Sequence, residues 1–181
     1  KASGKNELAE DDIRDSLNEA IATLGENITL GKSCRMELGT SGTIGQYVHS
    51  NGKIAVLVEL NCANDSSATQ PAFAELAKNV AMQIAAASPL AVSPEEIDND
   101  LLEREREVYR QKARQEGKPE QIVEKIAEGA IKKYFKEACL LEQAYIRDDK
   151  ITVGDLLKQC GKELGDTLSI KRFVRAQLSA E

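Results

Sequence analysis

Residues 93–142 constrain the fold more than any other stretch, because they predict two long charged helices that fold back on each other. Ser93, Pro94 and Glu96 fit an N-cap, a first helical position and a capping box, so a helix is expected to begin near Pro94. Gly-Lys-Pro at residues 117–119 predicts the break between the two helices. Each helix would be roughly 30 Å long at 1.5 Å per residue. An antiparallel helical hairpin that projects from a globular base is typical of a surface for another macromolecule.

Each predicted helix has one narrow apolar stripe. The stripe of the first helix is Leu101, Leu102, Val108, Tyr109 and Ala113, and that of the second is Ile122, Ile126, Ile131, Tyr134, Phe135 and Ala138. So narrow a stripe in a charged sequence can face only one partner helix. The alternative is a solvated helical pair that packs on its own domain, since charge runs are usually solvent faces.

Composition limits the classes of function. With 181 residues, of which 41% are hydrophobic and 4% aromatic, the chain can form one sizeable core or two small ones. Its net charge of −6, with Lys and Arg spread along the chain, argues against direct nucleic-acid binding. We expect no membrane partner either, because no apolar run reaches the length of a transmembrane span and no signal-peptide pattern opens the chain.

The four cysteines are far apart and lie beside apolar residues. Cys34, Cys62, Cys139 and Cys160 form no C-x-x-C pair. Buried, reduced thiols are the usual outcome of such a pattern, so we expect a reducing compartment and no disulfide framework.

The chain contains an apparent internal repeat. A shift of 140 positions aligns residues 12–39 with residues 152–179 without a gap. Six pairs are identical: Asp15/Asp155, Leu17/Leu157, Leu24/Leu164, Gly25/Gly165, Arg35/Arg175 and Leu38/Leu178. Each copy predicts a short helix, a glycine-terminated turn and a strand, and therefore two related subdomains. Chance similarity between two helix–strand units is the alternative.

A β-hairpin is predicted between the repeats. Its strands are Thr43–Val48 and Lys53–Leu60, and its turn has Asn51 and Gly52 at the centre, because both residues tolerate positive φ. The second strand is apolar on both faces and should be central, with a helix over residues 71–87 covering the sheet. The predicted fold class is α+β: a helix-covered mixed or antiparallel sheet with internal duplication and a protruding antiparallel coiled-coil helical hairpin.

The sequence shows no recognisable reaction centre. His49 is the one histidine, and the glycines match no phosphate-binding pattern. Asp98 and Asp100 lack the glycine that a calcium loop needs, so we expect no catalytic, cofactor-binding or metal-binding residues. An enzyme that uses Cys62 or Cys139 as a nucleophile would require a nearby base that the sequence does not show.

Several segments together resemble the elongation factor Ts family over nearly the whole chain. They are residues 53–62, 76–86, 117–122, 124–129, 140–143 and 171–175. Gly-Lys-Pro at the helical break, followed by Glu-Gly in the return helix, is the most specific of these features.

The resemblance implies a translation factor that is not an enzyme. Such a protein binds elongation factor Tu in its GDP-bound and nucleotide-free forms, disturbs its magnesium and phosphate site, and lets GTP replace GDP. It acts in a bacterial cytoplasm or in an organelle of bacterial descent, without a cofactor of its own. The candidate partner contacts are Asp65, Asn79, Gln83, Tyr145 and Ile146, and ordinary surface or half-buried packing is the alternative for each.

One departure from the family concerns residues 63–69. The family typically has Glu-Thr-Asp-Phe-Val-Ala-Arg here, but only Asp65 and Ala68 match, and Ser66 cannot supply the apolar wedge. We therefore expect an N-terminally truncated fragment whose intact wedge lies upstream of Lys1. The expected division is 1–42 as the remnant of a first core subdomain, 43–92 with 143–181 as the second, and 93–142 as the helical hairpin. The alternative function is a docking or dimerisation module that acts through the helical hairpin without exchange, and pairing of two copies stays open.

Overall fold

The computed structural model describes residues 10–29, 31 and 33–178, and the chain divides into two units, Lys1–Gly39 and Thr40–Glu181. In the first unit, helix α1 (Glu10–Leu24) ends at Gly25, which has a φ of 70°. A glycine in this left-handed conformation is a common helix terminator. The strand predicted after it is not found at residues 26–29, 31 and 33–39. The internal duplication therefore stays a prediction.

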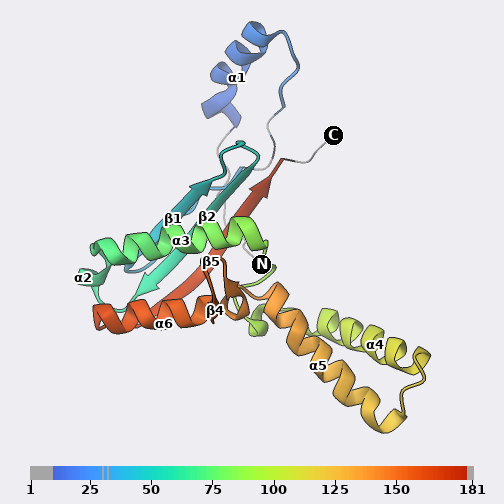
Figure 1. Cartoon of the computed structure of the whole chain (residues 1–181). Coiled ribbons are helices and arrows are strands. Elements are labelled where there is room, and N and C mark those ends of the chain that lie inside the picture. Colours follow the sequence, from blue (N-terminus) through green and yellow to red (C-terminus); the bar gives the residue numbers. More distant parts are fainter. Residues whose placement is uncertain (1–9, 30, 32, 179–181) are drawn as a thin grey trace. The chain divides into compact units, whose positions relative to one another are not determined.

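The second unit contains a three-stranded antiparallel sheet (Figure 1). Its order is β1 (Gly42–Val48), β2 (Ile54–Cys62) and β5 (Leu168–Gln177), so the predicted central position of the second strand is confirmed. Strands β3 (Ala144–Tyr145) and β4 (Asp148–Thr152) form a separate antiparallel pair.

The turn between β1 and β2 is wider than predicted. His49 N donates to Ile54 O at 2.9 Å, and Gly52 N donates to His49 O at 2.8 Å. Gly52 has a φ of 68°, but Asn51 is not in the left-handed region, so only one of these two residues adopts the positive φ that both tolerate. A turn of this kind needs left-handed backbone only at the glycine.

Helices cover one face of the sheet. The long helix α3 (Pro71–Ala87) packs on β1 and β2, and α6 (Val153–Leu164) packs on β5 and α3. The core between these helices and the sheet includes Val58, Leu60, Phe73, Val80 and Ile84. These features confirm the α+β class and the predicted span of α3. Contact between α3 and β1 is close enough that a Cβ on Gly45 would lie 2.4 Å from a backbone oxygen of α3.

The helical hairpin consists of α4 (Asn99–Gln115) and α5 (Glu120–Ala138). Its predicted start near Pro94 is wrong, because Pro94–Glu96 forms only a 3₁₀ turn. The N-cap of α4 is Asp98, whose carboxylate accepts hydrogen bonds from the amides of Asp100 and Leu101. Glu96 instead accepts from the Val92 amide, so no capping box starts the long helix.

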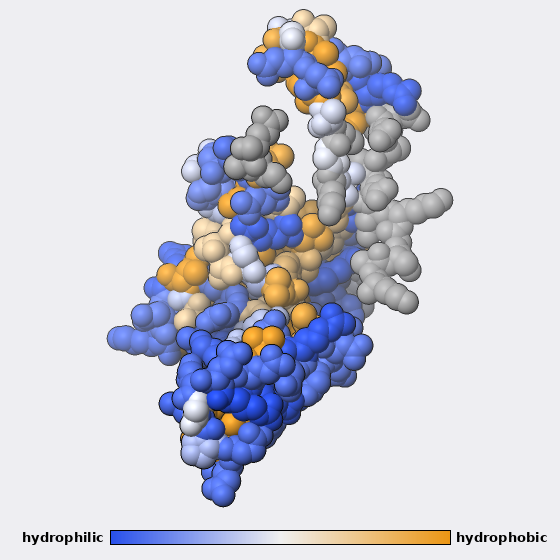
Figure 2. Space-filling model, turned by 90° about the vertical axis from the view of Figure 1, so that its right-hand side faces the viewer, coloured by the Kyte–Doolittle hydropathy of each residue, from blue (hydrophilic) through white to orange (hydrophobic). Residues whose placement is uncertain are grey.

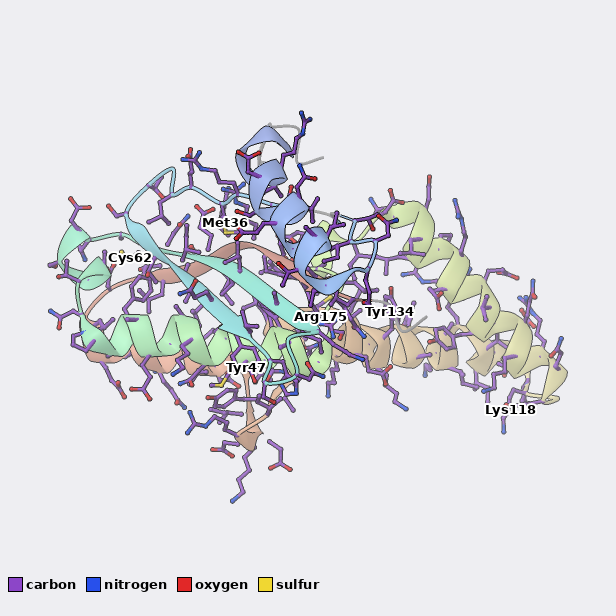
Figure 3. The ribbon with its side chains drawn as sticks, turned by 90° about the horizontal axis from the view of Figure 1, so that it is seen from above. Met36, Tyr47, Cys62, Lys118, Tyr134 and Arg175 are labelled. Atoms are coloured by element: carbon purple, nitrogen blue, oxygen red, sulfur yellow. The ribbon has the colours of Figure 1, made fainter. Side chains whose placement is uncertain are left out.

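The seam between α4 and α5 differs from the predicted stripes. Ala113, Val123, Ala127 and Ile131 are buried, whereas the predicted stripe residues Leu101, Val108, Ile122 and Ile126 are exposed. The pairing is antiparallel, since Arg110 bonds Glu124 while Arg114, one turn further on, bonds the earlier Glu120. Figure 3 shows Lys118 at the tip and Tyr134 nearer the base. The more specific coiled-coil geometry stays a prediction, as do the predicted domain limits.

The base of the helical hairpin has a small core of its own. Ala91, Ile97, Ala138 and Cys139 are buried there, with Leu102, Tyr134 and Phe135 packed against them. Leu140 N donates to Ala91 O at 2.9 Å and Leu141 N donates to Val92 O at 3.0 Å. The two chain segments that enter and leave the helical hairpin are therefore joined side by side.

Candidate protein-binding groove

An open groove lies between the exposed side of α3 and the turn that joins β3 to β4. It has a volume of about 730 Å³ and is lined by Ala74, Glu75, Lys78, Asn79, Met82, Ile146 and Arg147. Met82 and Ile146 contribute large apolar side chains to the lining. The charged side chains in it are those of Glu75, Lys78 and Arg147. Ile146 is 47% exposed, which leaves an apolar side chain accessible at the groove. Such a surface suits a protein segment better than a small molecule, which usually needs a more enclosed pocket.

A buried glutamine holds one wall of this groove. The Gln83 amide nitrogen donates to the Gln143 side-chain oxygen and to Ala144 O, each at 3.2 Å. Its side-chain oxygen accepts from Ile146 N at 2.8 Å. Gln83 is only 1% exposed, so its polar atoms require these internal partners. The network therefore fixes the turn that presents Ile146.

The rim of the groove joins the same two elements through a second contact. Arg147 donates to the Asn79 side-chain oxygen at 3.0 Å, and this bond is exposed. Tyr145, one residue before Ile146, is buried. Asn79 and Ile146 line the groove, whereas Tyr145 and Gln83 are buried and do not line it.

The turn that contains Asp65 is built separately. Asp65 begins the short helix α2 (Asp65–Ala68) and accepts a hydrogen bond from the Ser41 hydroxyl. Asp166, from the α6–β5 connection, accepts from Ala63 N at 3.1 Å and from Asn64 N at 3.0 Å. Hydrogen bonds from the Ser67 hydroxyl and these amides hold the pKa of Asp166 below its usual value. An ionised Asp166 thus clamps the turn that presents Asp65.

Two of the five predicted contact residues lie at this groove. Asn79 and Ile146 line it, Gln83 and Tyr145 are buried, and Asp65 is on a different turn. Partner contact by each of the five stays a prediction, and the burial of Gln83 and Tyr145 favours a supporting role. Sequence reasoning missed Met82 and Arg147. The spacing Glu75, Lys78, Asn79 and Met82 marks one exposed helix face and could have identified the first of them.

Other reactive groups in the described residues are sequestered or isolated. Burial raises the pKa of the thiols of Cys62, Cys139 and Cys160, and that of Cys139 rises to about 11. His49 lies at the β-hairpin turn, with Nδ1 3.0 Å from the Tyr47 hydroxyl. Across residues 10–29, 31 and 33–178 there is no group of three or more His, Cys, Asp or Glu side chains arranged to hold a metal ion. The helices of that same part are all too short or too polar to cross a membrane.

These features place the chain among α+β proteins that have an open surface groove and a charged helical hairpin. A family model described as elongation factor TS matches residues 2–180. The chain belongs to the elongation factor Ts family.

Relatives from several bacteria agree with this assignment. Elongation factor Ts from Nitratidesulfovibrio vulgaris (strain DP4) is 61% identical over 166 residues, covering 92% of this chain and 58% of the relative. The Lawsonia intracellularis protein is 60% identical over 171 residues, covering 93% and 58%, respectively. That of Desulfovibrio desulfuricans is 52% identical over 168 residues, covering 92% and 59%. The chain thus spans less than two thirds of the length of these relatives.

Proposed function

We propose that this chain is part of a translation elongation factor that promotes release of GDP from elongation factor Tu. Its family membership is the observation that carries the proposal. In this role the chain performs no bond chemistry and acts in the bacterial cytoplasm. It binds the nucleotide-free GTPase more tightly than the GDP-bound form, and GDP weakens its binding by the same factor.

The groove supports this proposal by its position and chemistry. We place one partner contact at Asn79 and Ile146, with Met82 adding apolar area between them. Exposed apolar side chains with polar neighbours are typical of the centre of a protein interface. The buried Gln83 holds this contact in place, because its side-chain oxygen accepts a hydrogen bond from Ile146 N.

Asp65 provides a second proposed contact. Its turn is held by Asp166, so its carboxylate is presented by a fixed backbone. Ser66 offers no apolar side chain at the next position. We therefore propose that this turn contributes orientation and polar contact, while the groove contributes most of the apolar burial.

The test is the release rate of a fluorescent GDP analogue from purified elongation factor Tu, with and without the chain, together with co-elution of the two proteins. We expect faster release and co-elution, both reduced by Ile146→Glu. Leu90→Glu is the matched control, because Leu90 is also an exposed apolar residue but lies outside the groove. Co-elution without faster release would favour the docking function over exchange. Absence of both would refute the proposal for this chain.

A further inference from the structure

The helical hairpin is attached to the rest of the second unit mainly through its base. Helix α5 packs chiefly on α4 and on the 3₁₀ turn η2 (Leu140–Glu142), whereas α3 packs on β1, β2 and α6. Figure 2, with the helical hairpin end of the second unit toward the viewer, shows a mainly hydrophilic surface there. The residues that leave the helical hairpin at its base are therefore the ones that can relate α5 to α3.

The last turn of α5 depends on Gln143 for one of its hydrogen bonds. The final carbonyls of an α-helix have no amide partner within the helix. Leu141 N, four residues after Glu137, donates to Val92 O. The Gln143 side-chain nitrogen donates to Glu137 O at 2.7 Å, and Gln143 N donates to Cys139 O at 3.1 Å. Gln143 therefore holds the end of α5 through both its side chain and its backbone.

The same side chain also reaches α3. Its oxygen accepts from the Gln83 side-chain nitrogen at 3.2 Å, and the Gln83 side-chain oxygen accepts from Ile146 N at 2.8 Å. Gln143 is only 4% exposed and Gln83 only 1%, so both amides need partners within the protein. A continuous series of hydrogen bonds thus runs from the Glu137 carbonyl, through two buried amides, to the Ile146 amide at the groove. We call this series the glutamine network.

The order of donors and acceptors gives the glutamine network a single direction. Glu137 O can only accept, and Ile146 N can only donate. If one glutamine amide turned over by itself, two acceptors would face each other on one side of it and two donors on the other. Neither amide can therefore turn without losing hydrogen bonds on both sides. Since apolar packing is not directional, the glutamine network constrains how α5 is oriented relative to α3 more tightly than packing does.

We propose that Gln143 is a positioning residue that couples the helical hairpin to the groove. Loss of either half of the glutamine network loosens the other half, so the end of α5 and the turn at Ile146 are ordered together. A protein that binds at Ile146 then also orders the end of α5. By linkage, a contact that orders the helical hairpin strengthens binding at the groove by the same factor. The effect on binding rests on the proposed function, whereas the coupling within the chain does not.

The coupling is tested first without a partner. Gln143→Met keeps the approximate volume of the side chain and removes both of its side-chain hydrogen bonds. Native-state hydrogen exchange follows the Ile146 amide at the groove and the Cys139 amide, which donates to Phe135 O in the last turn of α5. Each of these amides has a partner other than Gln143, so a change in its exchange reports an effect carried through the structure.

We expect Gln143→Met to speed exchange of the Ile146 and Cys139 amides about tenfold or more, relative to the Val58 amide in β2. The Val58 amide is the internal reference for global unfolding, because Val58 is fully buried in the central strand. Gln83→Met, which leaves Gln143 in place, should speed exchange of the Cys139 amide as well, because coupling acts in both directions.

Ile97→Val is the control for lost packing, since Ile97 is buried in the core at the base of the helical hairpin. It should leave exchange of the Ile146 amide unchanged relative to Val58. Residual dipolar couplings of the α4 and α5 amides report the orientation of the helical hairpin relative to the sheet. They should be reduced by averaging in Gln143→Met and preserved in Ile97→Val. Circular dichroism confirms that all variants are folded.

Binding is tested as the affinity of nucleotide-free elongation factor Tu for each variant, measured by calorimetry. We expect about tenfold weaker binding of Gln143→Met and unchanged binding of Ile97→Val. Unchanged exchange of the Ile146 amide in Gln143→Met would overturn the coupling, whether or not the chain binds elongation factor Tu. Altered exchange with unchanged affinity would overturn its effect on binding. Absence of binding by the unmodified chain would instead refute the proposed function, and the exchange rates would still decide the coupling.

Discussion

Replacement of Gln83 by methionine tests whether the buried amide network supports the groove. Gln83→Met keeps the length and approximate volume of the side chain but removes three hydrogen bonds, to Gln143, Ala144 and Ile146. The Ile146 amide and the Gln143 side-chain oxygen would lose a partner. A buried polar group without a partner costs about 1–3 kcal/mol, and the bond to Ile146 is only partly buried. We therefore expect the free energy of unfolding of the second unit to fall by about 2–4 kcal/mol.

Two measurements test the effect of Gln83→Met. Urea unfolding gives the free energy of unfolding, and native-state hydrogen exchange gives the protection of the Ile146 amide. The control is Gln121→Met, the same substitution at an exposed position of α5, which should change stability by less than about 0.5 kcal/mol. If Gln83→Met also changes stability by less than about 0.5 kcal/mol, or leaves Ile146 equally protected, the network does not hold the groove.

Four further predictions concern packing, thiol reactivity and pH. Gly45→Ala should destabilise the second unit by about 1–3 kcal/mol in urea unfolding, because the new methyl group would collide with the α3 backbone; a neutral result would show that α3 moves freely. Gly129→Ala should stabilise α5 by about 0.5–1 kcal/mol and slow its amide exchange, whereas destabilisation would mean that the methyl group meets an obstacle. Mass spectrometry after iodoacetamide treatment should show half-exposed Cys34 modified well before Cys139, since burial raises the Cys139 pKa to about 11; equal rates near pH 8 would contradict the burial. The folded-state pKa of Asp166 is lowered, so its stabilisation should be present above its unfolded-state pKa and lost as pH falls through the folded-state value. Asp166→Asn should remove that part of the pH dependence of the free energy of unfolding, measured by urea unfolding at several acidic pH values. An unchanged pH dependence would refute the clamp.

Local patterns in the sequence predict the sheet and α3 well. The limits of α3 follow from Pro71 at its first turn and from Ser88-Pro89 at its end, and the predicted limits agree with the structure. The buried position of Gln83 was also available from the sequence, since Leu76, Val80 and Gln83 fall on one helical stripe. Its polar side chain suggested a surface contact instead. A buried glutamine becomes predictable only when its distant partners, here Gln143 and Ala144, are known.

The helical hairpin shows why large apolar side chains do not always mark a buried seam. The isoleucines at 122 and 126 are the most hydrophobic residues of the early part of α5, yet Val123 and Ala127 face α4. Arg110 and Glu124 bond across one flank of the seam. The second stripe is then left to solvent. The periodicity of one helix alone cannot distinguish two adjacent apolar stripes, because which of them is buried depends on the packing of the partner helix.

The start of α4 shows a related competition between local signals. Ser93 and Glu96 satisfy a capping pattern, and Asp98 satisfies another only a few residues later. Leu141 N bonds Val92 O, which ties the backbone just before Ser93 to the segment that leaves the helical hairpin. A long helix beginning at Pro94 would have to start from this tethered segment. The later cap at Asp98 lets the chain turn first, and tertiary contacts thereby decide which local signal is used.

One buried network serves two surfaces of the second unit. Gln143 contacts Gln83 behind the groove, and its side-chain nitrogen also donates to Glu137 O, near the end of α5, at 2.7 Å. The turn at Ile146 and the last turn of α5 are therefore linked through the side chains of Gln83 and Gln143. Both positions are held by hydrogen bonds of fixed direction, which restrain orientation more strictly than apolar packing alone. The groove and the base of the helical hairpin are consequently positioned together, and a partner that binds the groove meets a hairpin base whose last turn is already fixed.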